Sequence, residues 1–75
     1  MGKSLYSKDQ TNLANKLKEA REKAKLDQKA IAKLLGKTQS YISKVESGQR
    51  RVDVIELKEF SRIYKQKLSF FVQEK

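Results

Sequence analysis

The stretch that decides the fold is residues 27–48, DQKAIAKLLGKTQSYISKVESG. Asp27 and Thr38 are residue types that begin helices, because their side-chain oxygens accept hydrogen bonds from free backbone N–H groups. Gly36 and Gly48 can take the left-handed conformation that ends helices. This spacing predicts one short helix that stops at Gly36 and a second that ends at Gly48. Their apolar residues recur at helical spacing and are Ile31, Ala32, Leu34, Leu35, Ile42 and Val45.

Two short helices joined by a tight glycine turn form a helix-turn-helix, in which the second helix projects from the domain. Such a helix fits the major groove of DNA, which is about 12 Å wide. The small side chain of Ala32 allows the two helices to approach each other closely. We therefore expect this stretch to be a DNA-binding unit.

One further helix is predicted before this unit. Ser7 and Gln10 fit a capping box for a helix over residues 8–24. Its apolar stripe consists of Leu13, Leu17, Ala20 and Ala24. We expect a short N-terminal extension over residues 1–7 and a single domain over residues 8–75.

Two more helices are predicted after the unit. Asp53 and Glu56 repeat the capping-box pattern, and Ser69 is expected to cap a last short turn. Their apolar residues are Leu57, Phe60 and Tyr64 in the fourth helix and Phe70 and Phe71 in the last, with Phe71 expected in the core. The predicted fold class is all-α, a compact domain of five helices.

The charge of the chain indicates a polyanionic partner. Eighteen Lys and Arg residues face nine Asp and Glu residues, a formal net charge of +9 at pH 7. Residues 28–45 contain no acidic residue, and their four lysines are Lys29, Lys33, Lys37 and Lys44. The alternative explanation is a solvated lysine surface without a partner.

Composition also argues against several classes of protein. The chain has no Cys and no His, so it lacks the usual metal ligands and the side chains that most often catalyse reactions near neutral pH. We expect no cofactor, no metal and no enzymatic activity. No apolar run approaches the roughly 20 residues of a membrane helix, and the N-terminus shows no secretion signal. We expect a cytoplasmic protein without a membrane partner.

The pattern resembles the lambda-repressor and Cro-like helix-turn-helix family, also called the XRE family. The likeness covers about Leu17 to Phe71. It is carried by Leu17, Arg21, Leu26, Gln28, Ile31, Ala32, Leu35, Gly36, Ser40, Ile42, Ser43, Val45, Glu46, Gly48 and Arg50. The resemblance implies a five-helix domain whose second and third helices form the helix-turn-helix, with the third as the recognition helix.

Two residues depart from the family pattern. Lys37 stands where relatives usually have an apolar residue after the turn glycine. Either its aliphatic stem lies along the surface or that corner of the core is thinner. Lys65 stands where relatives commonly have a glycine that ends the fourth helix.

The N-terminal turn of the third helix is expected to read the bases. Gln39 can pair with adenine, Ser40 can bond several bases, and Lys44 can reach guanine or a phosphate. Thr38 is expected to cap the helix and to contact the DNA backbone.

The resemblance and the polar residue types suggest further contacts to the DNA backbone. Gln28 matches a family glutamine that binds a phosphate, and the loop after Gly48 lies along the phosphates in relatives. The expected backbone contacts are Gln28, Thr38, Tyr41, Ser43, Gln49, Arg50 and Arg51. The alternatives are an exposed first-turn residue for Gln28, a space-filling aromatic for Tyr41 and a solvated basic turn for the loop.

Arg21 and Glu46 are expected to have a structural role. In the family, the matching residues form a largely buried salt bridge between the first and third helices. Loss of either partner would leave the other charge buried and unpaired.

The function expected is a sequence-specific transcriptional regulator of double-stranded DNA, a homodimeric repressor on a near-palindromic operator. Its half-sites would lie about 34 Å apart, and residues 68–72 would form the dimer surface. The family includes phage or plasmid repressors, restriction-modification controllers and antitoxins, so a toxin or RNA polymerase is a further candidate partner. The alternative function is a protein-interaction module that keeps the fold and binds an acidic partner.

Overall fold

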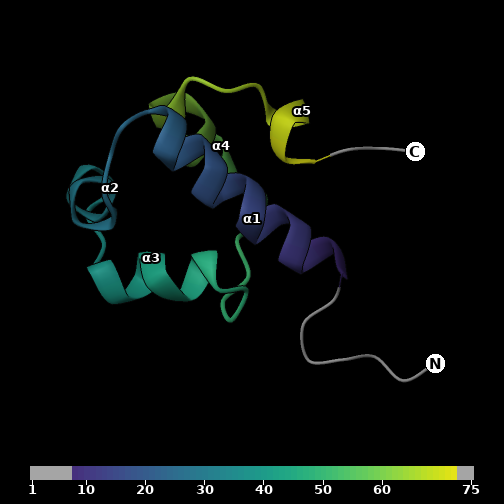
Figure 1. The fold of residues 1–75 in the computed structure, drawn as a ribbon, viewed down its shortest axis with the longest axis horizontal. Coiled ribbons are helices and arrows are strands. Elements are labelled where there is room, and N and C mark those ends of the chain that lie inside the picture. Colours follow the sequence, from purple (N-terminus) through teal and green to yellow (C-terminus); the bar gives the residue numbers. More distant parts are fainter. Residues whose placement is uncertain (1–7, 73–75) are drawn as a thin grey trace.

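The computed structural model describes residues 8–72 and confirms the predicted all-α fold (Figure 1). The five helices are α1 (Lys8–Lys23), α2 (Gln28–Leu35), α3 (Gln39–Glu46), α4 (Val54–Tyr64) and α5 (Leu68–Phe71). No strand occurs in this part of the chain. None of the helices described is long and apolar enough to cross a membrane. The capping box expected at Ser7 lies outside the described residues.

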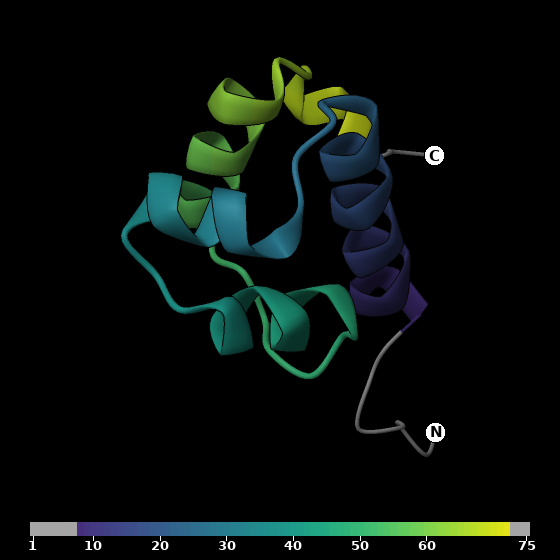
Figure 2. The ribbon, with the colours of Figure 1, turned by 60° about the vertical axis from the view of Figure 1, so that its left-hand side comes forward.

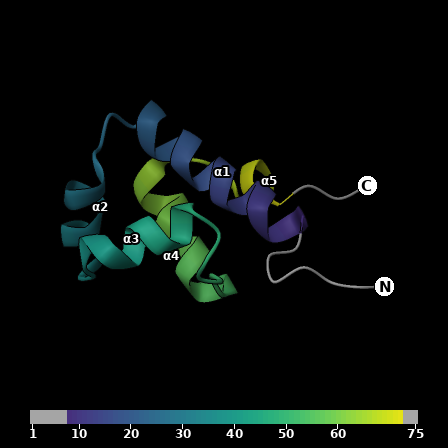
Figure 3. The ribbon, with the colours of Figure 1, turned by 60° about the horizontal axis from the view of Figure 1, so that its bottom comes forward.

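The longest helix, α1, organises the domain. It packs against α3, α4 and α5, while α2 packs against α3. In Figures 1 and 2, α3 runs along the lower edge of the domain. Figure 3, which brings that edge forward, shows α3 at the surface. One side of α3 therefore packs on the domain and the other faces solvent.

The core consists of the predicted apolar stripes. Its buried side chains are Leu17, Ala20, Ile31, Ala32, Ile42, Val45, Leu57, Phe60, Tyr64 and Phe71. Burial of a side chain of the size of Leu or Phe contributes roughly 1.5–3 kcal/mol, so these residues supply most of the packing energy. Leu34, on the same predicted helix as Ile31, is instead 60% exposed.

Three predicted helix caps are confirmed by their hydrogen bonds. Asp27 Oδ1 accepts from the backbone N–H of Ala30 at 2.7 Å, and Thr38 Oγ1 accepts from Tyr41 at 3.0 Å. Asp53 and Glu56 form the complete capping box of α4, with bonds of 2.8 and 2.9 Å. These polar residues explain why α2, α3 and α4 begin where they do.

One predicted helix end is confirmed and one predicted cap is wrong. The last residue of α3 is Glu46, and Gly48 ends the helix in the left-handed conformation expected of it, with a φ of 84° and its N–H bonded to the Val45 carbonyl. Ser69 does not cap α5 but lies inside it, because the N–H of Phe70 already bonds to the Lys67 carbonyl at 2.9 Å. The last helix therefore begins without a side-chain cap.

Lys65 takes a left-handed conformation, which favours glycine. Its φ is 59°, close to the 69° of Gly36 at the end of α2. Beyond Lys65, the N–H of Gln66 bonds to the Ser61 carbonyl at 3.0 Å, which closes the last turn of α4. A residue with a β-carbon is strained in this conformation, so the helix end forms at an energetic cost.

Candidate nucleic-acid interface

Helix α3 presents a polar face that begins at its N-terminus. Ile42 and Val45 anchor it, with 0% and 2% of their surface exposed. The side chains on the open side of this helix are exposed and are those of Gln39, Ser40, Ser43 and Lys44. The two buried residues fix the rotation of α3, so that its short polar side chains point away from the domain.

A chain of hydrogen bonds joins the first residues of α2 and α3 to the interior. Gln39 Nε2 lies 3.5 Å from Gln28 Oε1, a long contact, and Gln28 Nε2 donates to Glu46 Oε1 at 3.1 Å. The Gln28 side chain is therefore bonded to the first and the last residue of α3.

Arg21 and Glu46 form an ion pair between α1 and α3. Arg21 Nε donates to Glu46 Oε2 at 2.7 Å and Nη2 donates to Oε1 at 3.2 Å, while Nη1 donates to the Leu26 carbonyl at 2.8 Å. The side chains are only 11% and 5% exposed. The hydrogen bond to Glu46 raises the pKa of Arg21, and burial partly opposes that effect. The guanidinium is thus bonded on three of its nitrogens.

Tyr41 connects α3 to the start of α4. Its hydroxyl donates to Glu56 Oε2 at 2.9 Å, so in this conformation the hydroxyl hydrogen is not directed at a DNA phosphate. Burial, followed by the bond to Glu56, raises the pKa of Tyr41 to about 12. The backbone N–H of Asp53, together with Tyr41 and Arg50, holds the pKa of Glu56 below its usual value.

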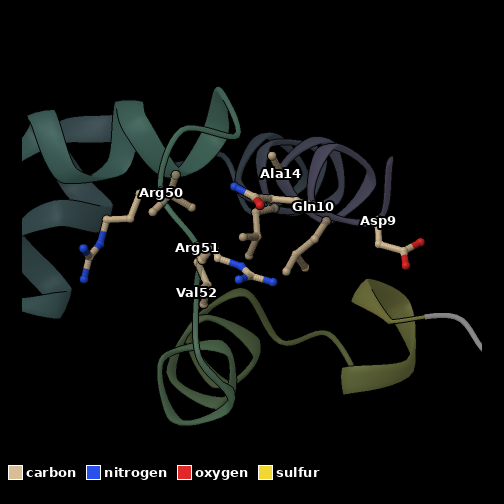
Figure 4. Close-up of a pocket in the computed structure, with 9 residues that line it drawn as sticks. Asp9, Gln10, Ala14, Arg50, Arg51 and Val52 are labelled. Atoms are coloured by element: carbon tan, nitrogen blue, oxygen red, sulfur yellow. The ribbon is translucent and has the colours of Figure 1, made fainter. Parts of the chain in front are cut away.

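Arg50 and Arg51 are neighbours in sequence but point in opposite directions from the loop after α3 (Figure 4). The Arg50 guanidinium lies 4.9 Å from the centre of the Tyr41 ring, and its Nη2 lies 3.5 Å from Glu56 Oε2. Arg51 points into a hollow of about 260 Å³ beside α1. The two guanidinium groups therefore lie on different sides of the loop, although both residues line the hollow.

Both apolar and polar residues line the hollow next to Arg51. Leu13, Ala14 and Val52 are among the apolar residues, and Asp9 is among the polar ones. Gln10 Nε2 donates to the Gly48 carbonyl, which ties α1 to the turn after α3. Gln49, beyond that turn, donates to Ser47 Oγ at 3.0 Å.

Reasoning from sequence missed two residues of this region. Glu56 was expected only as a capping residue, although it also binds Tyr41 and Arg50. Lys37 was a departure from the family pattern, and the structure places its ammonium 5.2 Å from the centre of the Tyr41 ring. The contact between Tyr41 and Glu56 has no local signal, because these residues are 15 positions apart. Lys37 precedes Tyr41 by four positions, and that spacing is the signal that could have indicated their contact.

Comparisons with known proteins agree with this architecture. A family model described as Helix-turn-helix (HTH_3) matches residues 17–71. The restriction-modification controller protein C.AhdI from Aeromonas hydrophila has a similar structure, with a TM-score of 0.78 and 26% sequence identity. The alignment covers 85% of this chain and 93% of that one. No curated protein sequence matched the chain.

Two longer proteins contain a similar fold. Apo-HppE has a TM-score of 0.78 and 26% identity, and the match covers 84% of this chain but 35% of that one. An HTH_3 family transcriptional regulator from Vibrio cholerae has a TM-score of 0.73 and 24% identity, with 83% and 35% covered. This chain spans about a third of each of them. With a family model matching most of its length and the fold in agreement, the chain belongs to the HTH_3 helix-turn-helix family.

Proposed function

We propose that the chain is a sequence-specific regulator of transcription that binds double-stranded DNA through α3. The observation that carries this proposal is the exposed polar face of α3, held outward by the buried residues Ile42 and Val45. A short helix with this face suits a major groove. The net charge of +9 supplies the attraction to the phosphates.

In this proposal, three side chains of α3 read the bases, namely Gln39, Ser40 and Lys44. Within residues 8–72, the Gln39 side chain is held by a single contact of 3.5 Å to Gln28, so it can exchange that partner for an adenine edge at little cost. Lys44 and Ser40 are exposed on the same helix. Short polar side chains at the start of a recognition helix are those that reach base edges.

The contacts to the DNA backbone are proposed for residues that surround this face. They are Gln28, Thr38, Tyr41, Ser43, Gln49, Arg50 and Arg51. The geometry favours Arg50 over Arg51, because Arg50 lies beside Tyr41 of α3 whereas Arg51 points toward the hollow beside α1. Tyr41 would contribute to the backbone contact only by giving up its bond to Glu56.

We further propose a cytoplasmic homodimer that represses transcription from a near-palindromic operator. Leu68 and Val72, which are 38% and 51% exposed, provide apolar surface for the partner in residues 68–72. Among the contexts known for the family, the similarity to a restriction-modification controller over 93% of that chain favours a controller protein. The same similarity supports a regulator rather than an enzyme, since the chain spans only about a third of HppE.

A salt series of gel shifts tests the proposal. A protein that contacts about six phosphates loses affinity by orders of magnitude between 50 and 200 mM salt. Selection of bound sequences from a random DNA pool then supplies the operator. Gln39→Ala should change the selected consensus sequence. Arg50→Ala, which removes a proposed backbone contact instead, should lower affinity and leave the consensus sequence unchanged. Absence of binding at low salt would contradict DNA binding and favour a protein-interaction module.

A further inference from the structure

Two cations from different segments approach the ring of Tyr41. Lys37 lies in the turn between α2 and α3, and its ammonium is 5.2 Å from the ring centre. Arg50 lies in the loop after α3, and its guanidinium carbon is 4.9 Å from the same centre. Like charges this close to one ring favour the approach of an anion. The turn, the recognition helix and the loop thus combine to form a cationic group around Tyr41.

In the free chain, the anion beside this group is the carboxylate of Glu56. Its Oε2 accepts the Tyr41 hydroxyl at 2.9 Å and lies 3.5 Å from Arg50 Nη2. Its Oε1 accepts the backbone N–H of Asp53 at 2.9 Å. The Arg50 side chain is still 49% exposed. The carboxylate therefore pairs with Arg50, one of the two cations beside the ring, and much of the guanidinium surface is open to solvent.

We propose that Lys37, Tyr41 and Arg50 form a binding site for the phosphate backbone, which Glu56 occupies in the free chain in place of phosphate. The inference rests on the proposed function and adds Lys37 as a phosphate ligand and Glu56 as a competitor. Phosphate oxygens accept the same hydrogen bonds as a carboxylate oxygen. An approaching phosphate replaces Glu56 Oε2 as the partner of the Tyr41 hydroxyl and of Arg50. Glu56 Oε1 remains hydrogen-bonded to the backbone N–H of Asp53 at the start of α4.

Glu56→Gln tests the competition, because glutamine keeps the shape of the side chain and also suits the third position of a capping box. We expect this variant to bind DNA about three- to tenfold more tightly, since the ion pair with Arg50 no longer opposes phosphate binding. Glu59→Gln removes the same charge from an exposed position on α4 and should change affinity by less than about twofold. In an Arg50→Ala background, Glu56→Gln should have no effect.

Lys37→Gln tests the second cation. It should lower affinity about three- to tenfold and reduce the salt dependence by about one phosphate contact. Lys67→Gln is the matched control, because Lys67 precedes α5, on the side of the domain away from α3 (Figure 1). Circular dichroism should show that all of these variants retain the helical content of the parent chain.

A titration with inorganic phosphate, followed by NMR at the side chains of Lys37 and Arg50, separates this inference from the proposed function. The Glu56→Gln variant should bind phosphate more tightly than the parent chain. If no variant binds DNA but this difference is seen, the proposed function fails and the phosphate site stands. Equal or weaker binding of both DNA and phosphate by Glu56→Gln would overturn the inference. The inference would also be overturned if Glu56→Gln still strengthened DNA binding in the Arg50→Ala background.

Discussion

Replacement of Glu46 by alanine is expected to destabilise the domain strongly by leaving Arg21 buried without its counter-ion. The Arg21 side chain is only 11% exposed, and two of its three hydrogen bonds go to Glu46, at 2.7 and 3.2 Å. Removal of one partner from a buried ion pair costs about 3–5 kcal/mol. A domain of this length has a total stability of roughly 4–11 kcal/mol, so the loss is a large part of the whole.

The measurement is urea unfolding followed by circular dichroism, with the free energy of unfolding taken from curves of equal slope. Glu19→Ala is the matched control. Like Glu46, Glu19 forms ion pairs, with Lys16 at 3.8 Å and with Lys23 at 3.7 Å. All three of these side chains, however, are at least 34% exposed. The control should lose less than about 1 kcal/mol.

A loss for Glu46→Ala no larger than that of Glu19→Ala would refute the reasoning, because it would show that solvent screens the buried pair. Substitution of both partners, as in Arg21→Met with Glu46→Leu, should recover much of the stability, since no unpaired charge is left inside. Stability has to be measured before DNA binding in these variants. A partly unfolded protein would otherwise be mistaken for one that has lost a DNA contact.

Two further substitutions test strain just after α4 and burial at its last residue. Lys65→Gly should raise the free energy of unfolding by about 0.5–1 kcal/mol, because the left-handed φ of 59° strains a residue with a β-carbon and the greater freedom of glycine in the unfolded chain offsets only part of the gain. Lys65→Ala keeps the β-carbon and should give no such gain in the same urea assay. Tyr64→Phe should stabilise the domain by about 1 kcal/mol, because the buried Tyr64 hydroxyl has no hydrogen-bond partner among the described residues. A thermal midpoint lowered by Tyr64→Phe would indicate that the hydroxyl is bonded in solution.

Much of the fold follows from the sequence because its signals are local. Asp27, Thr38 and Asp53 cap helices through bonds to residues three positions ahead, and the buried stripes repeat at helical spacing. The one misplaced cap, Ser69, has the same origin. Ser69 is a residue type that often caps helices, but α5 begins one residue earlier, at Leu68. The helix that places Phe71 in the core therefore already includes Ser69.

The candidate site also has one part that the sequence predicts and another that it does not. The open face of α3 follows from its period, since burial of Ile42 and Val45 exposes Gln39 and Lys44. The pairing of Arg21 with Glu46, by contrast, was expected only from the family resemblance, because nothing in the spacing of two residues 25 positions apart indicates a contact.

Only the tertiary structure decided which side chains meet across helices and loops. It brings Glu56 to Tyr41, turns Arg50 toward α3 and turns Arg51 toward α1. Caps and periodicity depend on neighbours within about four residues, whereas a loop has no period and the angle between packed helices depends on the whole core. The sequence by itself therefore determined the helices and the face of α3, while packing determined which charges surround that face.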